Sequence, residues 1–195
     1  VSVIVPTHNR ARLLGRALAS VRAQTLTDWE LIVVNDASTD DTASLLRGEF
    51  ACDRLRVIET RRALGPAHAR NLGIEAARGE YVAFLDDDDE WLPRKLELQL
   101  ATLAEGGAVL AHTAFLHTDR HGNTAVAGLP PLPGAGPLRD LVRGNYIGNS
   151  TVVARTAAVR AVGSFDTDMP FVIEDWDLWL RLARTGSFVA ITEPL

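Results

Sequence analysis

The stretch YVAFLDDDDEWLPRKL, residues 81–96, joins an apolar run to a helical pattern through four aspartates and a glutamate. Residues 81–85 predict a short buried strand, since apolar side chains fall on both of its faces. A helix is predicted over residues 93–104, with Pro93 at its first position, where a missing N–H breaks no helical hydrogen bond. Five consecutive carboxylates repel one another, so their place at the end of a buried strand needs a structural or chemical reason.

The same alternation of strand and helix runs through the first half of the chain. Three further apolar strand patterns cover residues 1–6, 29–36 and 56–59. Helical patterns follow them, the first capped by Asn9 and the others over residues 38–46 and 65–79. Strands that are apolar on both faces and alternate with helices predict an α/β fold, in which helices cover each side of a parallel sheet.

The second half of the chain has a mixed pattern. Strand patterns cover residues 108–119, 124–128 and 148–155, with a Gly-containing turn over residues 120–123. A Pro/Gly loop over residues 129–137 is long enough to form a flap, and helices are predicted over residues 156–163 and 174–186. The last helix carries an apolar stripe typical of core packing, formed by Trp176, Trp179, Leu180 and Ala183.

Length and composition are those of one globular domain. The 195 residues are 47% hydrophobic and 23% charged, and their net charge of −5 excludes the basic surface of a nucleic-acid-binding protein. We predict a single domain over residues 1–195, with a nucleotide-binding half, residues 1–105, and a mixed half, residues 106–195. Because Val1 already belongs to a strand pattern, we expect the chain to be a fragment of a longer protein.

Cysteine content and hydropathy bear on the compartment. Cys52 is the only cysteine, which excludes a disulfide framework and favours a reducing compartment. No apolar run approaches the ~18 residues of a membrane span, and no signal peptide opens the chain. We therefore expect a cytoplasmic location, or the cytoplasmic face of a membrane reached through parts of the protein outside this chain.

Three of the predicted strands end in polar sequences. These are PTHNR, residues 6–10, NDASTD, residues 35–40, and DDDDE, residues 86–90. In parallel α/β sheets, ligands bind beyond the carboxyl ends of the strands. The three loops should therefore meet at one rim of the sheet and form a binding site there.

The acidic run has two interpretations. Acids before a helix favour its dipole, and charge runs usually face solvent, but one or two acids are enough for that purpose. A divalent cation such as Mg²⁺ or Mn²⁺ removes the repulsion, because it takes one or two carboxylates and completes its shell with phosphates and water. The run therefore favours a cation that carries a phosphorylated substrate, with the remaining acids able to accept hydrogen bonds from ribose hydroxyls.

The roles of three other acidic residues remain open on the residues alone. Asp36 can begin a turn by accepting nearby backbone N–H groups, with Ser38 or Thr39 capping the next helix, or it can accept the imide N–H of a uracil or thymine base. Glu174 and Asp175 either favour the dipole of their helix or provide a catalytic base. The five histidines show no zinc spacing, and His8 is the one that lies in a rim loop.

Four segments resemble, in order, the signatures of the family 2 inverting glycosyltransferases of the GT-A fold. They are VSVIVPTHNRARLLGRALASVRAQT from residue 1, ELIVVNDASTDDT from residue 30, GPAHARNLGIEAARGEYVAFLDDDDEW from residue 65, and EDWDLWLRL from residue 174. The resemblance implies a Rossmann-like, mostly parallel sheet with an acceptor-binding second half. It also implies transfer of a sugar from a nucleotide diphosphate, with a UDP-sugar as the first choice, to an acceptor hydroxyl of a carbohydrate or glycoconjugate.

The resemblance implies a set of nucleotide-binding residues: Pro6, Thr7, His8, Arg10, Asp36, Arg70, Asp86 and Asp87. Within this set, Asp36 matches the aspartate that reads the base, and Arg70 falls near the diphosphate. Asp86 or Asp87 is expected to face the ribose.

The resemblance also implies a metal ligand and a base. Asp88 matches the position that binds Mn²⁺ or Mg²⁺, although the unusually full acidic run leaves the ligand open among residues 86–89. Asp175 matches the base that deprotonates the acceptor, and Glu174 is expected to support it. Asn35 stands where an aspartate is common in the family, which leaves Asp36 intact.

The sequence lacks the motifs of other enzyme classes that bind nucleotides or phosphates. The first loop, PTHNRA, has neither the GxGxxG of a Rossmann oxidoreductase nor the Gly-rich, Lys-bearing loop of a sugar-nucleotide pyrophosphorylase, and the DxDx[TV] of aspartate phosphotransferases is missing. The non-enzymatic alternative is a nucleotide-sugar-binding module that recruits partners. The acids at Asp36, Asp88 and Asp175 argue against that alternative.

Overall fold

The computed structural model describes residues 1–118, 123–128, 136–170 and 172–195. Its strands are β1 (Ser2–Thr7), β2 (Glu30–Asn35), β3 (Leu55–Glu59), β4 (Tyr81–Phe84), β5 (Leu110–Thr118), β6 (Thr124–Ala127), β7 (Val153–Arg155) and β8 (Phe188–Pro194). Its helices are α1 (Ala11–Arg22), α2 (Thr42–Arg47), α3 (Pro66–Ala76), α4 (Lys95–Gly106), α5 (Pro137–Arg143), α6 (Thr156–Ala161) and α7 (Glu174–Leu182), with a 3₁₀ turn, η1, at Asn149–Thr151. No helix among these residues is both long and apolar enough to cross a membrane.

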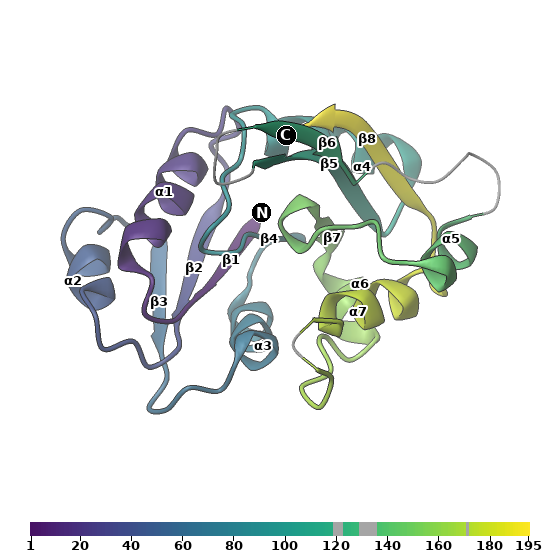
Figure 1. Ribbon diagram of the computed structural model, residues 1–195. Helices are drawn as coiled ribbons and strands as arrows, with labels where there is room; N and C mark the ends of the chain where they lie inside the picture. Colours follow the sequence, from purple (N-terminus) through teal and green to yellow (C-terminus); the bar gives the residue numbers. More distant parts are fainter. Residues whose placement is uncertain (119–122, 129–135, 171) are drawn as a thin grey trace.

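One eight-stranded sheet runs through both halves of the chain, in the order β3-β2-β1-β4-β7-β5-β6, with β8 paired to β5 (Figure 1). The four strands of the first half are parallel, with Val3 opposite Leu31 and Ile4 opposite Phe84. In the second half, β7 runs antiparallel to β4 and β5, whereas β8 is parallel to β5. The predicted α/β sheet, parallel in its first half, is confirmed.

Alternate residues of the central strand β1 enter two separate cores. Val3 and Val5 pack in one core with Leu14 of α1 and residues of α2 and α4. Ile4, on the opposite face, packs with Ile74 of α3 and with residues of α6 and α7. Helices therefore cover both faces of the sheet (Figure 1), as expected for strands whose side chains are apolar on both sides.

The caps predicted for α1 and α2 are wrong, because side chains of the two rim loops accept backbone N–H groups in a different arrangement. Helix α1 begins after Arg10, and Asn9 adopts a left-handed conformation with a φ of 56°. The Asn9 side chain instead accepts the backbone N–H of Thr39 at 2.7 Å. Asp40, which was not predicted as a cap, accepts backbone N–H groups at the starts of both helices, from Ala11 of α1 and Thr42 of α2, each at 3.0 Å.

The second half differs from its prediction at several elements. The sequence reading missed both α5 and β8 and placed the end of the last helix, now α7, beyond Leu182. On α7, Trp179 is fully buried, whereas Trp176, Leu180 and Ala183 are only partly buried, so the core stripe is centred on Leu178, Trp179 and Leu182. The predicted turn over residues 120–123 and the Pro/Gly flap over residues 129–137 fall mainly on residues outside the described ranges.

Gly73 tests how closely α3 packs on the sheet. A Cβ atom at this position would lie 2.4 Å from Cγ2 of Ile4, which is fully buried in β1. Gly73→Ala should therefore lower the free energy of unfolding by about 1–3 kcal/mol through overpacking, measured by urea denaturation. Gly106→Ala is the matched control, because a Cβ there meets nothing within 4 Å, and it should stabilise α4 slightly. Equal stabilisation by both variants would contradict this close approach.

Candidate active site

The carboxyl ends of the parallel strands border a pocket of about 430 Å³. Its wall includes the whole predicted nucleotide-binding set and the predicted metal ligand: Pro6, Thr7, His8, Arg10, Asp36, Arg70, Asp86, Asp87 and Asp88. The remaining wall was not predicted and comes from Ala63, Gly65, Pro66 and Ala69. The three polar loops thus meet at one rim, as expected for a parallel sheet.

The Asp36 carboxylate holds a distant loop and does not begin its own turn. It accepts the hydroxyl of Thr60 at 2.8 Å and the backbone N–H groups of Leu64 at 2.9 Å and Gly65 at 2.8 Å. Asn35 makes the local turn, since its side-chain oxygen accepts the N–H of Ser38 at 3.2 Å. The turn interpretation of Asp36 is therefore wrong, and its 4% exposed side chain lies in the pocket wall.

The first rim loop packs against the second and the third. The Nδ1–H of His8 donates to the backbone carbonyl of Asp36. Thr7 donates its hydroxyl to the Asp87 carboxylate at 2.7 Å. Burial raises the pKa of Asp87, while this hydrogen bond and the charge of Arg10 lower it.

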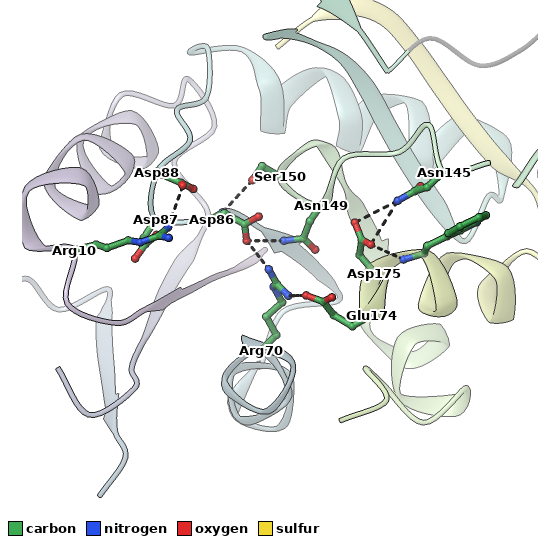
Figure 2. Close-up of polar contacts among 11 residues, drawn as sticks. Arg10, Arg70, Asp86, Asp87, Asp88, Asn145, Asn149, Ser150, Glu174 and Asp175 are labelled. Atoms are coloured by element: carbon green, nitrogen blue, oxygen red, sulfur yellow. Dashed lines mark hydrogen bonds and ion pairs between the residues drawn. The ribbon is translucent and has the colours of Figure 1, made fainter. Parts of the chain in front are cut away.

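Two arginines balance the acidic run (Figure 2). Arg10 lies 3.1 Å from Asp87 and 3.0 Å from Asp88, and Arg70 lies 2.8 Å from Asp86. Farther along, Glu90 pairs with Arg16. The arginines thus offset much of the charge repulsion within the acidic run, from which the sequence predicted a bound cation.

The donor set fits a divalent cation only if a substrate completes its shell. Among the described residues, no group of three His, Cys, Asp or Glu side chains could hold a metal ion. Asp88 remains about half exposed, with Arg10 as its ion-pair partner. One accessible carboxylate is what Mg²⁺ or Mn²⁺ takes when phosphates and water provide the other ligands, so Asp88 suits an ion that arrives with a phosphorylated substrate.

Arg70 joins the acidic run to helix α7. Its guanidinium lies 2.9 Å from Glu174 and 2.8 Å from Asp86, and the Arg70 and Glu174 side chains are 6% and 5% exposed. One oxygen of Glu174 and the Nε of Arg70 are buried without a hydrogen-bond partner in the described structure. Because a buried ion pair is costly to break, this contact fixes the start of α7 beside the pocket.

Asp175 follows Glu174 and faces the other way, toward Asn145 (Figure 2). Burial raises the pKa of Asp175 to about 6, the N–H of Trp176 lowers it, and the negative charge of Glu174 raises it again. Burial therefore outweighs the hydrogen bond from the Trp176 N–H. Neither Glu174 nor Asp175 is part of the pocket wall; the Arg70–Glu174 pair links their helix to it. A carboxylate with a pKa of about 6 is suited to general-base chemistry.

The sequence reading missed the contribution of the segment around η1. Asn149 donates to the Asp86 carboxylate at 2.9 Å, and Ser150 accepts the Asp86 N–H at 3.0 Å. Asn145 lies 3.5 Å from both carboxylate oxygens of Asp175. The available signal was the polar sequence GNST, residues 148–151, between apolar neighbours, which was assigned to a strand.

Comparison with known proteins places this site in a family. The Glycosyl transferase family 2 profile matches residues 2–156. The chain is 30% identical over 194 residues to the Escherichia coli UDP-Glc:alpha-D-GlcNAc-diphosphoundecaprenol beta-1,3-glucosyltransferase WfgD, covering 98% of this chain and 72% of that protein. It is 33% identical over 189 residues to the putative teichuronic acid biosynthesis glycosyltransferase TuaG of Bacillus subtilis, covering 95% and 73%.

Solved structures share the fold along nearly the whole chain. S. aureus TarS 1–349 in complex with UDP-GlcNAc matches with a TM-score of 0.82 and 24% identity, over 98% of this chain and 56% of that chain. The Pyrobaculum calidifontis mannosyltransferase PcManGT, in complex with GDP-Man and Mn²⁺, matches with a TM-score of 0.73 and 25% identity, over 99% and 54%.

Several of these relatives are longer than this chain. The chain spans little more than half of the two solved chains. It spans 18% of an uncharacterised Rickettsia bellii glycosyltransferase, with which it shares 40% identity over 122 residues, 63% of this chain. The family profile nevertheless covers most of the sequence, so this chain belongs to glycosyl transferase family 2 and has the GT-A fold.

Proposed function

We propose that this chain is the catalytic part of an inverting glycosyltransferase, which moves a sugar from a UDP-sugar to an acceptor hydroxyl of a carbohydrate or glycoconjugate. The observation that carries the proposal is the single pocket that gathers all the predicted nucleotide-binding residues, with Asp175 held beside it through the Arg70–Glu174 pair. The name of WfgD gives UDP-Glc as its donor, and TarS binds UDP-GlcNAc. PcManGT binds GDP-Man, so a GDP-sugar is the second candidate.

Donor recognition follows from the acceptor capacity of the rim. An ionised carboxylate has about four acceptor sites. Asp36 accepts three donors, from Thr60, Leu64 and Gly65, and the Leu64 N–H is shared by both of its oxygens. The imide N–H of uracil would therefore take the place of one of the two Leu64 contacts. Asp86 or Asp87 would accept ribose hydroxyls, and Asp88 would hold the Mn²⁺ or Mg²⁺ ion. Such an ion would neutralise charge on the departing diphosphate.

The proposed reaction is a single displacement. Asp175 takes the proton of the acceptor hydroxyl as the acceptor oxygen forms a bond to the anomeric carbon. The bond from that carbon to the diphosphate oxygen breaks on the opposite face, which inverts the configuration. The transition state has oxocarbenium character, as in glycoside cleavage. Glu174 takes no proton in this scheme, because its carboxylate is paired with Arg70.

The alternative function is a module that binds a nucleotide sugar without turnover. Asp175 argues against this alternative. A carboxylate with a pKa of about 6 is suited to act as a base, and a module that only binds a nucleotide sugar needs no base. A cytoplasmic location is part of the proposal, in keeping with the exposed, unpaired Cys52.

Asp175→Asn should separate catalysis from binding. It keeps the shape of the side chain and removes its basicity, so transfer from UDP-glucose to a panel of sugar acceptors should fall by ~10²–10⁴-fold. UDP affinity, measured by calorimetry, should stay unchanged.

Glu174→Gln is the matched control for Asp175→Asn. Glu174→Gln should lower the thermal stability of the fold, since it leaves Arg70 without its buried charged partner, and it should reduce the transfer rate less than Asp175→Asn does. Swapped phenotypes would move the base to Glu174. Donor binding by the unmodified chain without transfer to any acceptor would favour the binding module.

The pH dependence of transfer should report Asp175. With a pKa of about 6, the base is ionised above that pH, and kcat should fall about tenfold per pH unit below it. The stability effect has the opposite sign. The side chain of an aspartate in the unfolded chain has a pKa of ~3.9. Ionised Asp175 therefore lowers the free energy of unfolding above pH 6, and this loss of stability vanishes as the pH falls toward 4.

Asp175→Asn should therefore gain thermal stability relative to the unmodified chain at pH 8 and lose that gain near pH 4. A pH profile without a step near 6, or a step that survives in Asp175→Asn, would exclude this assignment.

The cation can be tested through the donor alone. Asp88→Ala should weaken UDP binding much more than uridine binding, because an ion at Asp88 would contact phosphates and not the base. EDTA should weaken UDP binding by the unmodified chain and have little further effect on Asp88→Ala. UDP binding at full strength in EDTA would remove Asp88 from the role of metal ligand.

A further inference from the structure

The only lysine of the chain, Lys95, is fully buried. Lysine is almost never fully buried without a compensating partner, because its charge is strongly hydrated. No carboxylate pairs with Lys95 in the described structure. Its ammonium group donates to the side-chain oxygen of Gln99 and to the backbone carbonyl of Thr151 at 3.1 Å, and it lies 4.7 Å from the centre of the Trp91 ring. Two N–H donors of Lys95 thus meet oxygen acceptors, and the face of the Trp91 ring lies near the same nitrogen.

Lys95 belongs to a group of three side chains that hold the backbone of η1. The Thr151 carbonyl accepts both the Lys95 ammonium and the Gln99 amide, the latter at 2.9 Å. The indole N–H of Trp91 donates to the preceding carbonyl, that of Ser150, at 2.7 Å. The segment that follows the acidic run therefore fixes two consecutive carbonyls of this short turn.

Two residues of η1 hold Asp86, the first aspartate of the acidic run (Figure 2). Ser150 accepts the backbone N–H of Asp86 at 3.0 Å, and the Asn149 amide donates to the Asp86 carboxylate at 2.9 Å. The other contact of that carboxylate oxygen is Arg70. Both the backbone and the side chain of Asp86 thus depend on where η1 lies.

We propose that Lys95 is a positioning residue of the donor site, which acts through the Thr151 carbonyl and η1 to orient Asp86. The inference rests on the proposed function, since it assigns the ribose side of the donor to Asp86. An apolar side chain would fill the same space but would leave the Gln99 oxygen and one acceptor site of the Thr151 carbonyl unpaired, which is costly in a buried region.

The role holds in either protonation state of Lys95. Burial lowers the pKa of Lys95 well below its ordinary value. A neutral amine still carries two N–H donors, which is enough for Gln99 and Thr151. The argument therefore depends on the donors of the side chain and not on its charge.

Amide hydrogen exchange tests the inference without a ligand. Lys95→Met keeps the length and removes the donors, and the exchange of the Asp86 N–H should become at least about tenfold faster by NMR, since its acceptor on Ser150 is no longer held. Leu103→Ala is the matched control on the same helix, because this fully buried residue lies in the core and outside the group. It should destabilise the fold and leave Asp86 protected relative to global unfolding.

A double-mutant cycle then links Lys95 to the donor. Lys95→Met should weaken UDP and uridine by the same factor, roughly 5- to 10-fold, about the worth of one hydrogen bond. Added to Asp86→Ala, it should change UDP affinity by less than about twofold, because the residue it acts through is gone. Additive effects of the two changes would overturn the inference.

The remaining outcomes are distinguishable. Unchanged exchange at Asp86 in Lys95→Met overturns the inference whether or not UDP binds, whereas a lack of UDP binding by the unmodified chain refutes the proposed function alone. If Lys95→Met does not fold, Gln99→Met removes the other donor to the Thr151 carbonyl and should speed Asp86 exchange in the same way. Protection of Asp86 equal to that of the unmodified chain in Gln99→Met would also contradict the inference.

Discussion

The rest of the site depends on the two ion pairs of the buried Arg70 guanidinium. It extends from α3 to Asp86, just after β4, and to Glu174, at the start of α7. Charges withdrawn from water are stable only when they are paired, so α7 cannot shift without leaving the buried Glu174 carboxylate unpaired, whereas Asp86 is partly exposed. The Arg70–Glu174 contact joins residues separated by 104 positions and links the pocket wall to the helix that carries Asp175.

The two arginines of the pocket differ in how firmly they hold the acids. The Arg10 side chain is 49% exposed, so solvent screens its pairs with Asp87 and Asp88 and they contribute little to stability. The pair of Arg70 with Glu174 is buried and far more costly to break. Arg70 is therefore held more firmly in the pocket wall than Arg10, whose ion pairs face solvent.

The ionised form of Asp175 lowers the stability of the folded chain. Burial and the nearby negative charge of Glu174 disfavour its ionised form, which is the form that a general base uses. Two apolar cores, one on each face of the sheet, offset this cost. Functional sites commonly carry such locally unfavourable groups on a scaffold that is stable enough to hold them. The same logic applies to Lys95, which is buried without an acid partner among the described residues but donates to two oxygen acceptors beside the Trp91 ring.

The sequence alone determined the parallel half of the sheet, the order of its helices and the meeting of three polar loops at one rim. These follow from local apolar patterns, since the geometry of parallel strands brings their carboxyl ends together. The family resemblance supplied nine residues of the pocket wall, and the other four were not predicted. Only the tertiary structure decided the partners of these residues. Asn9 contacts Thr39 instead of capping its helix, Asp36 holds Leu64 and Gly65, and Lys95 supports Thr151. Each of these contacts joins segments far apart in the chain, and a local pattern contains no information on which distant backbone group a buried side chain will meet.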